Sequence, residues 1–260
     1  MSSTREIPEF SIAEFHGKHT KYLWVIPVLN EAERIQNQLA RMKPQIALCD
    51  VIVVDGGSTD GSVDLEAMKK TGIRALLVKK GKGKLSAQLR IGFAYALREG
   101  YAGVVLMDGN NKDNPAAVTK FIEALEQDYD YVQGSRFLPG GKQEHTPLAR
   151  YLGIRLLHAP LISIASGIWY TDTTNGFKAL SRKFLEHPKL QPFRDVFDTY
   201  ELHSYIEVRA GDLKMKTKEI PVERVYPATG APPTKIKKIS GNFLMLKILF
   251  KACLRQYDPR

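Results

Sequence analysis

Short apolar segments alternate with helical segments through the first half of the chain. Apolar runs with the length of buried strands occupy residues 22–28, 51–55, 73–78 and 103–108. Segments with apolar residues at helical spacing follow them, over residues 31–42, 63–70, 85–100 and 115–127. This alternation predicts an α/β fold, in which one Rossmann-like, mostly parallel sheet is covered by helices on both faces.

A polar loop follows each of the four predicted strands. In chain order the loops are PVLNE (27–31), DGGSTDGS (55–62), KKGKGK (79–84) and DGNNKD (108–113). Ligands of open parallel sheets bind beyond the carboxyl ends of the strands. We therefore expect the four loops to form one ligand site.

The pattern changes after about residue 130. We expect strands over 131–137 and 216–222 and helices over 148–169, 197–210 and 239–255. No internal repeat or linker separates these elements from the first half. We predict a polar arm over residues 1–20 and one domain over 21–260, with a first half (21–130) and a specialised second half (131–260).

The chain is basic, with a formal net charge of +10. Nucleic acid, an anionic membrane surface or phosphorylated substrates could each be the partner. The basic stretches KKGKGK and KIKK lack the interleaved aromatic residues on which bases stack, so we expect no nucleic acid. The segment MSSTREIPEF has no apolar signal core, and we expect a cytoplasmic protein.

Two apolar segments bear on membrane contact. The longest nearly uncharged run, 159–171, is shorter than the ~20 residues of a spanning helix, so we do not expect the chain to cross a bilayer. The segment 239–255 carries Lys247, Lys251 and Arg255 at intervals of four. It is either a core helix with a solvated basic stripe or an interfacial helix that faces anionic headgroups.

The loop after the fourth strand resembles a metal site with one carboxylate replaced. Asp108 ends the strand, Asn110 stands where a second carboxylate would complete an Asp-x-Asp pair, and Lys112 follows two residues later. Mg²⁺ and Mn²⁺ take oxygen ligands, and substrate phosphates and water can complete their shell. The alternative is that Asn110, Asn111 and Asp113 only cap the helix beginning near Pro115.

Two further loops suggest a nucleotide. Lysines and backbone amides at the start of a helix, as in KKGKGK, form an anion site, and beside a metal loop this anion would be a diphosphate. Asp55 ends a strand before two glycines, where it could accept hydrogen bonds from a base or a ribose. A role for Asp55 in the turn itself is the alternative.

Seven motifs occur in an order that is specific as a set. They are VIPVLNEAERI, VIVVDGGSTDGS, GKGKLSAQLRIGFAYA, LMDGNNKDNP, VQGSRFLPGG, DTTNGFKAL and KEIPVERVYPATGAPPTKI. Over roughly residues 21–258 the chain resembles family-two glycosyltransferases of the glycosyltransferase A fold. More narrowly, it resembles the branch of dolichyl-phosphate mannose synthases and bacterial polyprenyl-phosphate sugar synthases.

The resemblance implies a role for several residues. Pro27, Glu31 and Asp55 would hold the nucleoside, and Lys84 would lie near the diphosphate. In the metal motif, the ligands of Mg²⁺ or Mn²⁺ would be Asp108 and Asn110. On the acceptor side the resemblance implies Arg136 at the acceptor phosphate, further basic contacts from Arg150, Arg224 and Lys235, and the carboxylates Asp172 and Glu201. The chain departs from the family pattern at Gly56, Asn110 and Lys112.

The implied reaction is a single displacement that inverts the anomeric carbon of a nucleotide-diphosphate sugar. A cation and positioned donors would take up the charge of the leaving diphosphate. A polyprenyl phosphate acceptor is already an anion and needs no base, whereas a sugar hydroxyl on a lipid-linked glycan needs one, for which Asp172 and Glu201 are candidates. A non-catalytic nucleotide-sugar-binding protein is a third interpretation, favoured by Asn110 and Lys112. The resemblance also implies a peripheral location at the inner face of the cell membrane.

Overall fold

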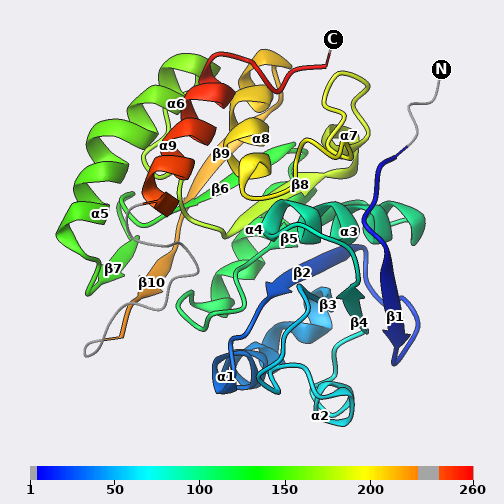
Figure 1. Cartoon of the computed structure of the whole chain (residues 1–260). Helices are drawn as coiled ribbons and strands as arrows, with labels where there is room; N and C mark the ends of the chain where they lie inside the picture. Colours follow the sequence, from blue (N-terminus) through cyan, green and yellow to red (C-terminus); the bar gives the residue numbers. More distant parts are fainter. Residues whose placement is uncertain (1–4, 228–239, 260) are drawn as a thin grey trace.

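A mixed sheet forms the centre of the structure, a computed structural model that describes residues 5–227 and 240–259. Within this part of the chain the sheet has eight strands in the order β1-β4-β3-β2-β5-β8-β6-β9, and β10 and β7 form a second, two-stranded sheet (Figure 1). The strands are β1 Phe10–Glu14, β2 Tyr22–Val28, β3 Asp50–Asp55, β4 Ala75–Lys79, β5 Gly103–Leu106, β6 Tyr131–Ser135, β7 Lys142–Glu144, β8 Lys178–Ser181, β9 Thr217–Pro221 and β10 Glu223–Val225.

Helices cover both faces of the main sheet. They are α1 Glu33–Met42, α2 Leu65–Lys69, α3 Leu85–Arg98, α4 Val118–Glu126, α5 Leu148–Gly153, α6 Ala159–Ser166, α7 Arg182–Leu185, α8 Glu201–Asp212 and α9 Ser240–Cys253. Shorter turns are η1 Lys43–Leu48, η2 Pro115–Ala117 and the π-helical η3 Ile154–His158.

The four strands predicted in the first half are confirmed as a parallel unit, β4-β3-β2-β5. In β2, Leu23 and Val25 join the apolar cluster on one face of the sheet, while Trp24 and Ile26 join the cluster on the other. Successive side chains of a strand point to opposite faces, so a strand that is covered on both sides must be apolar throughout. This is why YLWVIPV could be recognised from sequence.

The strand β8 lies in the middle of the sheet and was not predicted. It runs antiparallel to both β5 and β6 and joins them. Its sequence is only KALS, and its Lys178 is buried in an ion pair with Glu207. A charged residue in a short segment hides the apolar pattern that marks a central strand. Because of β8, the sheet continues to β6 and β9, which pair in parallel.

The expected arm over residues 1–20 is corrected by β1. Phe10–Glu14 pairs antiparallel with β4 and forms one edge of the sheet. The backbone N–H of Glu6 also donates to the carbonyl of Phe193, 3.0 Å away. The segment appeared polar because an edge strand is half exposed, and Ser11 and Ile12 face solvent.

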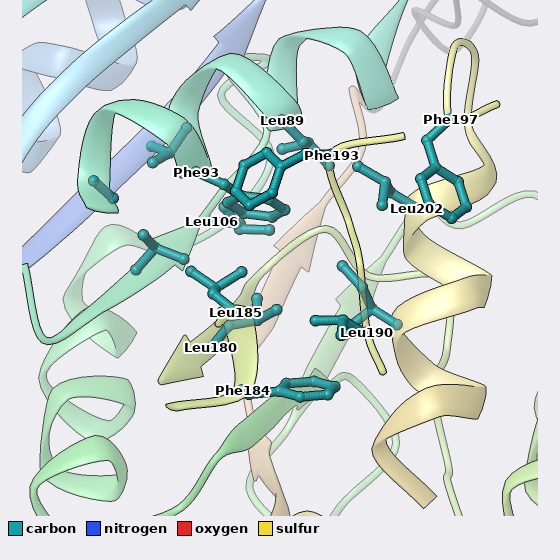
Figure 2. Packing of buried hydrophobic residues seen from close by; sticks show 14 of the residues in the cluster. Leu89, Phe93, Leu106, Leu180, Phe184, Leu185, Leu190, Phe193, Phe197 and Leu202 are labelled. Carbon is teal, nitrogen blue, oxygen red and sulfur yellow. The ribbon is translucent and has the colours of Figure 1, made fainter. Parts of the chain in front are cut away.

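The larger apolar cluster ties the two halves together. Leu89 and Phe93 of α3 pack towards Leu106 of β5 and Leu180 of β8, as Figure 2 shows. The same cluster takes in Leu202 of α8 and aromatic side chains of the segment between β8 and α8, namely Phe184, Phe193 and Phe197. Helix α3 is therefore fixed against the second half, which places its N-terminus close to the start of α8.

The second half is dominated by helices that pack on one another. The predicted helix 148–169 is continuous over Leu148–Ser166 and ends where Gly167 takes the left-handed conformation. Helix α8 contacts α6 and α9, and α6 contacts α9. Among the described residues, Leu148–Ser166 is the one helix long and apolar enough to cross a membrane, judged by length and composition alone. The run 159–171 considered above covers only part of it.

Candidate active site

A cavity of about 350 Å³ opens at the carboxyl ends of β2 and β5, between the two halves. Every loop expected at this site except DGGSTDGS contributes to its wall. The wall is completed by α5, η3, α8, β10 and α9. Its lining includes Pro27, Glu31, Lys84, Gln88, Asp108, Asn110, Lys112, Arg150, Ile154, His158, Thr174, Gly176, His203, Arg224, Tyr226, Asn242 and Met245.

Of the twelve candidate residues, Lys235 lies outside the described residues. Seven of the remaining eleven line the cavity, and four do not. The seven that line the cavity are Pro27, Glu31, Lys84, Asp108, Asn110, Arg150 and Arg224. The four that do not are Asp55, Arg136, Asp172 and Glu201. Each of those four is engaged by neighbouring groups of the protein.

Asp108 and Asn110 meet in the cavity wall. The Nδ2 of Asn110 donates to Oδ2 of Asp108 at 3.3 Å, and the same oxygen accepts from Nη2 of Arg224 at 3.0 Å. The Oδ1 of Asn110 is buried and has no hydrogen-bond partner in the described part of the chain. Burial alone would raise the pKa of Asp108, but the neighbouring positive charges, of which Arg224 contributes most, together hold the pKa below its usual value.

A glycine fixes the position of this carboxylate. A Cβ on Gly176 would lie 2.4 Å from Oδ1 of Asp108, too close for any side chain. The NGF part of the DTTNGF motif therefore packs directly against the Asp108 loop. The sequence alone gave no sign of this contact, because the two motifs lie far apart in the chain.

Arg224 joins two carboxylates at the cavity wall. Its guanidinium donates to Asp113 as well as to Asp108, and both Arg224 and Asp113 are buried. The nearby Asp113 brings Arg224 there, because the two residues form an isolated β-bridge. The two negative charges raise the pKa of Arg224 well above its usual value even though burial opposes this. Arg224 is therefore a permanent cation beside Asp108.

Tyr226 was not predicted as a site residue, and it contacts two further basic side chains. Its hydroxyl accepts from Nη1 of Arg150 at 2.9 Å, and the Nζ of Lys112 lies 4.9 Å from the centre of its ring. Burial alone would raise the pKa of Tyr226, but the charges of Arg224 and Arg150 outweigh it and lower the pKa. The signal in the sequence was the position of Tyr226, two residues after Arg224 on the same short extended segment.

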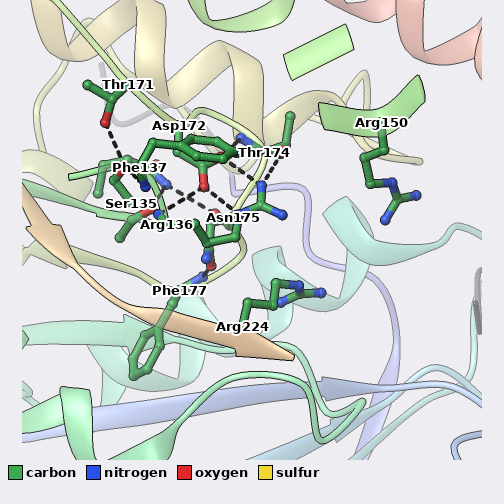
Figure 3. A network of polar contacts seen from close by, with 12 residues as sticks. Ser135, Arg136, Phe137, Arg150, Thr171, Asp172, Thr174, Asn175, Phe177 and Arg224 are labelled. Carbon is green, nitrogen blue, oxygen red and sulfur yellow. Dashed lines mark hydrogen bonds and ion pairs between the residues drawn. The ribbon is translucent and has the colours of Figure 1, made fainter. Parts of the chain in front are cut away.

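Arg136 and Asp172 form a closed pair beneath the cavity. The Nε of Arg136 donates to Oδ2 of Asp172 at 2.6 Å, and its Nη2 donates to Oδ1 at 2.9 Å and to Thr174 at 2.9 Å (Figure 3). The two side chains are 1% and 0% exposed. Burial would raise the pKa of Asp172, but Arg136 holds it below the usual value. Figure 3 shows Arg150 and Arg224 apart from this network.

Asp55 and Glu201 are each held by a turn. Asp55 accepts from the backbone N–H groups of Gly57 and Ser58 and from the Ser58 hydroxyl, so the turn role considered above is present. Glu201 accepts from the backbone N–H and the hydroxyl of Thr199 at the start of α8. Their proposed contacts with substrate remain predictions.

Two histidines also line the cavity. His158 shares a hydrogen bond with the Thr173 hydroxyl, at 2.6 Å from its Nδ1. Burial lowers the pKa of His158 to about 4 and that of His203 to about 3. Both rings are therefore neutral at physiological pH. Isolated histidines in the sequence gave no reason to single them out.

A separate group of potential metal ligands lies away from the cavity. The ligating atoms of His16, His19 and Asp50 lie within 4.8 Å of one another. The Oδ2 of Asp50 already accepts from the backbone N–H groups of His19 and Thr20 and from the Tyr101 hydroxyl. These bonds fix the turn before β2, and they explain why the residues converge.

The exposed side of α9 and its end carries both basic residues, Lys247 and Arg255, and large apolar residues. Lys247 is exposed, but Lys251 is half-buried near Tyr257, and Arg255 bonds to Asp212 and to the carbonyl of Ala165. The exposed large side chains of α9 and its end are Phe243, Leu246, Phe250 and Leu254.

The neighbouring helix also exposes apolar side chains. On α5, η3 and α6 these are Leu148, Leu152, Leu156, Leu157 and Ile164, and Trp169 follows α6. Figure 1 shows α5, α6 and α9 on the same side of the molecule. We call the exposed apolar residues of these helices, together with Trp169, the apolar face. Patches of this kind mark interaction sites.

Comparison with known proteins agrees with the fold and the motifs. The profile of glycosyl transferase family 2 matches residues 23–187, and the chain belongs to that family. An undecaprenyl-phosphate mannosyltransferase of Micrococcus luteus is 32% identical over 162 residues, which cover 61% of this chain and 65% of that protein. A polyprenol monophosphomannose synthase of Mycolicibacterium smegmatis is 28% identical over 167 residues, which cover 63% of each. The matches thus span somewhat less than two thirds of these relatives.

A solved structure confirms the glycosyltransferase A fold. Glucosyl-3-phosphoglycerate synthase from Mycobacterium tuberculosis, in complex with Mn²⁺, uridine diphosphate and glucosyl-3-phosphoglycerate, matches with a TM-score of 0.63 at 16% identity. The match covers 90% of this chain and 80% of that chain. At this identity the likeness concerns the fold alone.

Proposed function

We propose that this chain transfers a sugar, with inversion, from a nucleotide-diphosphate sugar to a polyprenyl phosphate. The observation that carries the proposal is the set of cations in one cavity, Lys112, Arg150 and Arg224, close to helices with exposed apolar side chains. Both substrates of such a reaction carry phosphate, and one carries a lipid chain. The names of the two bacterial relatives refer to undecaprenyl phosphate and polyprenol monophosphate, which supports a polyprenyl phosphate acceptor.

The donor would lie against the loops after β2, β4 and β5. Pro27, Glu31 and Lys84 line this part of the cavity, and Lys84 stands at the start of α3, where backbone amides favour an anion. The chemistry of Asp108 and Asn110 fits Mg²⁺ or Mn²⁺, because the Asn110 Oδ1 is buried without a partner among the described residues. When bound, the cation would neutralise charge on the leaving diphosphate.

The available carboxylates favour a phosphate acceptor over a sugar hydroxyl. A hydroxyl acceptor needs a general base, but Asp172 is locked by Arg136 and Glu201 is held by Thr199. A phosphate oxygen is already anionic and needs only to be positioned. Arg150, whose guanidinium reaches the cavity from α5, is suited to hold it.

We also propose that the chain lies peripherally on the inner face of the cell membrane, with the apolar face towards the lipid. Phe243 is 72% exposed on α9 and Leu156 is 72% exposed on η3. The inner sides of these helices line the cavity through Met245 and Ile154. A lipid-linked acceptor would thus meet the cavity and the membrane surface together.

A transfer assay tests the proposed function. A panel of labelled nucleotide sugars would be incubated with vesicles that contain polyprenyl phosphate or a lipid-linked glycan, with Mg²⁺ or Mn²⁺. We expect label in the polyprenyl phosphate. Label only in the glycan would identify the hydroxyl as acceptor, and nucleotide-sugar binding without turnover would indicate a non-catalytic binding protein.

A further inference from the structure

We propose that His16, His19 and Asp50 bind one Zn²⁺ ion, which ties the segment before β2 to the start of β3. The ligating atoms of the three residues lie within 4.8 Å of one another. Two imidazoles and one carboxylate form a known ligand set of zinc, and such sites leave a fourth position for another donor. This ion is separate from the Mg²⁺ or Mn²⁺ of the cavity, and its binding does not depend on the proposed sugar transfer.

The three residues lie at the end of the sheet opposite the cavity. Asp50 is the first residue of β3, and His16 and His19 belong to the connection that leads from β1 to β2. The cavity is at the carboxyl ends of β2 and β5, so the length of β2, Tyr22–Val28, separates the two sites. An ion in this place would therefore stabilise the fold and would not touch the substrates.

The ring of His16 presents a lone pair to another acceptor. Its Nδ1 lies 2.8 Å from the carbonyl oxygen of Gly17. A carbonyl can only accept, so we place the ring hydrogen on Nδ1, and Nε2 of the neutral ring then carries a lone pair. This Nε2 lies 3.4 Å from the carbonyl oxygen of Gly72. Two acceptors that face each other favour a cation between them.

The spacing of these two acceptors suits a tetrahedral ion. With zinc–ligand bonds of about 2.0–2.1 Å, two ligands of a tetrahedral site lie about 3.3–3.4 Å apart. The distance of 3.4 Å between His16 Nε2 and the Gly72 carbonyl has this value, so the carbonyl is a fitting fourth ligand. A proton on Nε2 is the competing occupant, because a charged imidazole would donate to both carbonyls.

The carboxylate of Asp50 is already held in one orientation. Its Oδ2 accepts from the backbone N–H groups of His19 and Thr20, at 3.0 and 3.2 Å, and from the Tyr101 hydroxyl at 2.7 Å. Its Oδ1 accepts no hydrogen bond from the residues that the structure describes. Carboxylates that ligate a metal are characteristically hydrogen-bonded in this way, which positions them before the ion arrives.

His19 is the ligand that must move. Its ring stacks on the ring of His16, with centroids 4.8 Å apart and an interplanar angle of 10°. The lone pairs of parallel rings do not converge on one point, so His19 has to rotate in order to bind the same ion. Its side chain is exposed and makes no hydrogen bond with the described residues, so rotation breaks only the stack. The same exposure gives the ion access.

Basic side chains near Tyr101 do not occupy the place of the ion. The Nζ of Lys18 donates to the carbonyl of Gly100 at 2.7 Å, and Arg74 pairs with Glu99 at 2.6 Å. Within the described part of the chain, neither forms an ion pair with Asp50. The negative charge of Asp50 is therefore left for a cation that enters from solvent.

Zinc affinity is the direct test. The full chain would be freed of metal with EDTA, dialysed, and titrated with Zn²⁺ by calorimetry, as wild type, His19→Asn and the control His145→Asn. His145 is also an exposed histidine, so the control makes the same change elsewhere on the surface. We expect one Zn²⁺ per chain at micromolar concentration, and a loss of at least about tenfold in affinity for His19→Asn. Mg²⁺ in excess should not compete, because it prefers oxygen ligands.

Thermal unfolding is the second measurement. An ion that binds only the folded chain raises the melting temperature, so Zn²⁺ should raise it for the wild type and for His145→Asn. The double variant His16→Asn/His19→Asn should show no rise. If the double variant is unfolded without metal, His19→Asn alone decides, because the His19 ring has no hydrogen bond to lose among the described residues.

Two outcomes would overturn the proposal. If the wild type does not bind Zn²⁺ at micromolar concentration, a proton and not a metal lies between His16 and the Gly72 carbonyl. If Zn²⁺ binds but His19→Asn matches His145→Asn, the ion is held elsewhere, for example by His158 and His203 in the cavity. Either result would leave the proposed sugar transfer untouched, because neither histidine of the zinc site lines the cavity.

Discussion

The two halves of the molecule treat their apolar side chains differently. In the first half the exposed large apolar residues are Ile12, Leu48 and Leu65, which are far apart in the chain. In the second half such residues follow one another along α5, α6 and α9, as in Phe243 and Phe250. Apart from Leu65 at the start of α2, the helices of the first half bury their large apolar residues, whereas those of the second half have apolar residues on both sides.

This difference matches the two substrates of the proposed reaction, one soluble in water and one in lipid. The loops after β2, β4 and β5 offer charged and amide groups, which suit a water-soluble nucleotide. The helices opposite them offer Ile154 and Met245 to the cavity and further apolar residues to the outside. In the proposed reaction the nucleotide sugar would reach the cavity from water and the lipid-linked acceptor would reach it from the membrane side.

The largest expected effect is on the nucleotide side. Asp108→Asn should reduce transfer roughly a thousandfold, because it removes the charged oxygen that would hold the proposed metal and that pairs with Arg224. Vesicle binding should stay unchanged if the halves act separately. A transfer assay and vesicle flotation on the same preparation measure both. Loss of flotation as well would show that the division between the halves is false. Asn110→Asp, the matched gain of charge, should tighten metal binding.

The next effect tests whether Arg136, in the second half, is a ligand for the acceptor or part of the scaffold. Arg136→Ala leaves Asp172 buried without its partner, so we expect a loss of about 3–5 kcal/mol in the free energy of unfolding. The exposed pair of Arg182 with Glu186 is the control, and Arg182→Ala should cost less than about 1 kcal/mol. Chemical denaturation measures both. An unchanged midpoint for Arg136→Ala, together with a raised acceptor KM, would make Arg136 an acceptor contact.

Membrane binding should weaken with each exposed apolar side chain that is removed from α9. Replacing both Phe243 and Phe250 by Ser should weaken binding to anionic vesicles by about tenfold for each side chain that enters the lipid. The control replaces Leu48 and Leu65, which are 46% and 48% exposed on the first half, against 72% for Phe243 and 47% for Phe250, and it should not change binding. Equal loss in the two variants would contradict a directional apolar face. Flotation at low and high salt would separate apolar from charge-driven binding.

The smallest expected effect is on the pH dependence of stability. The folded-state pKa of His158 is about 4, lowered by burial from 6.5. Its neutral form therefore stabilises the fold above about pH 6.5, and this contribution is lost as the pH falls towards 4. His158→Gln can still bond to Thr173 but does not titrate, so its melting temperature should fall less over this range. Parallel curves for variant and wild type would show that His158 is solvated.

The sequence predicted those strands of the sheet whose residues are apolar without interruption. The strands 22–28 and 51–55 were evident because they are covered on both faces. The strand β8 was not predicted, because its Lys178 makes the segment look polar. In the folded chain this lysine is paired with Glu207, which is distant in the sequence. The strand β1 was not predicted, because it lies at the edge of the sheet and is partly exposed to water.

The site was predictable at the level of loops but not of side-chain direction. The loop positions of Asp108 and Lys84 place both in the cavity, as expected. Nothing in GSRF indicated that Arg136 points into Asp172, since a motif does not encode the partner that it meets. Tyr226 was missed for the same reason, because Arg150 and Lys112 reach it from distant parts of the chain.

The position of β8 also governs the order in which the protein can assemble during synthesis. β4, β3, β2 and β5 can pair as soon as they leave the ribosome, because each finds a parallel neighbour within the first half. β6 is made next, but its partners among the described strands are β8 and β9, which are made later. Until Lys178 emerges, β5 presents an unpaired edge and β6 has no place in the sheet. Nascent chains that pause in this interval are the ones most exposed to aggregation through strand edges.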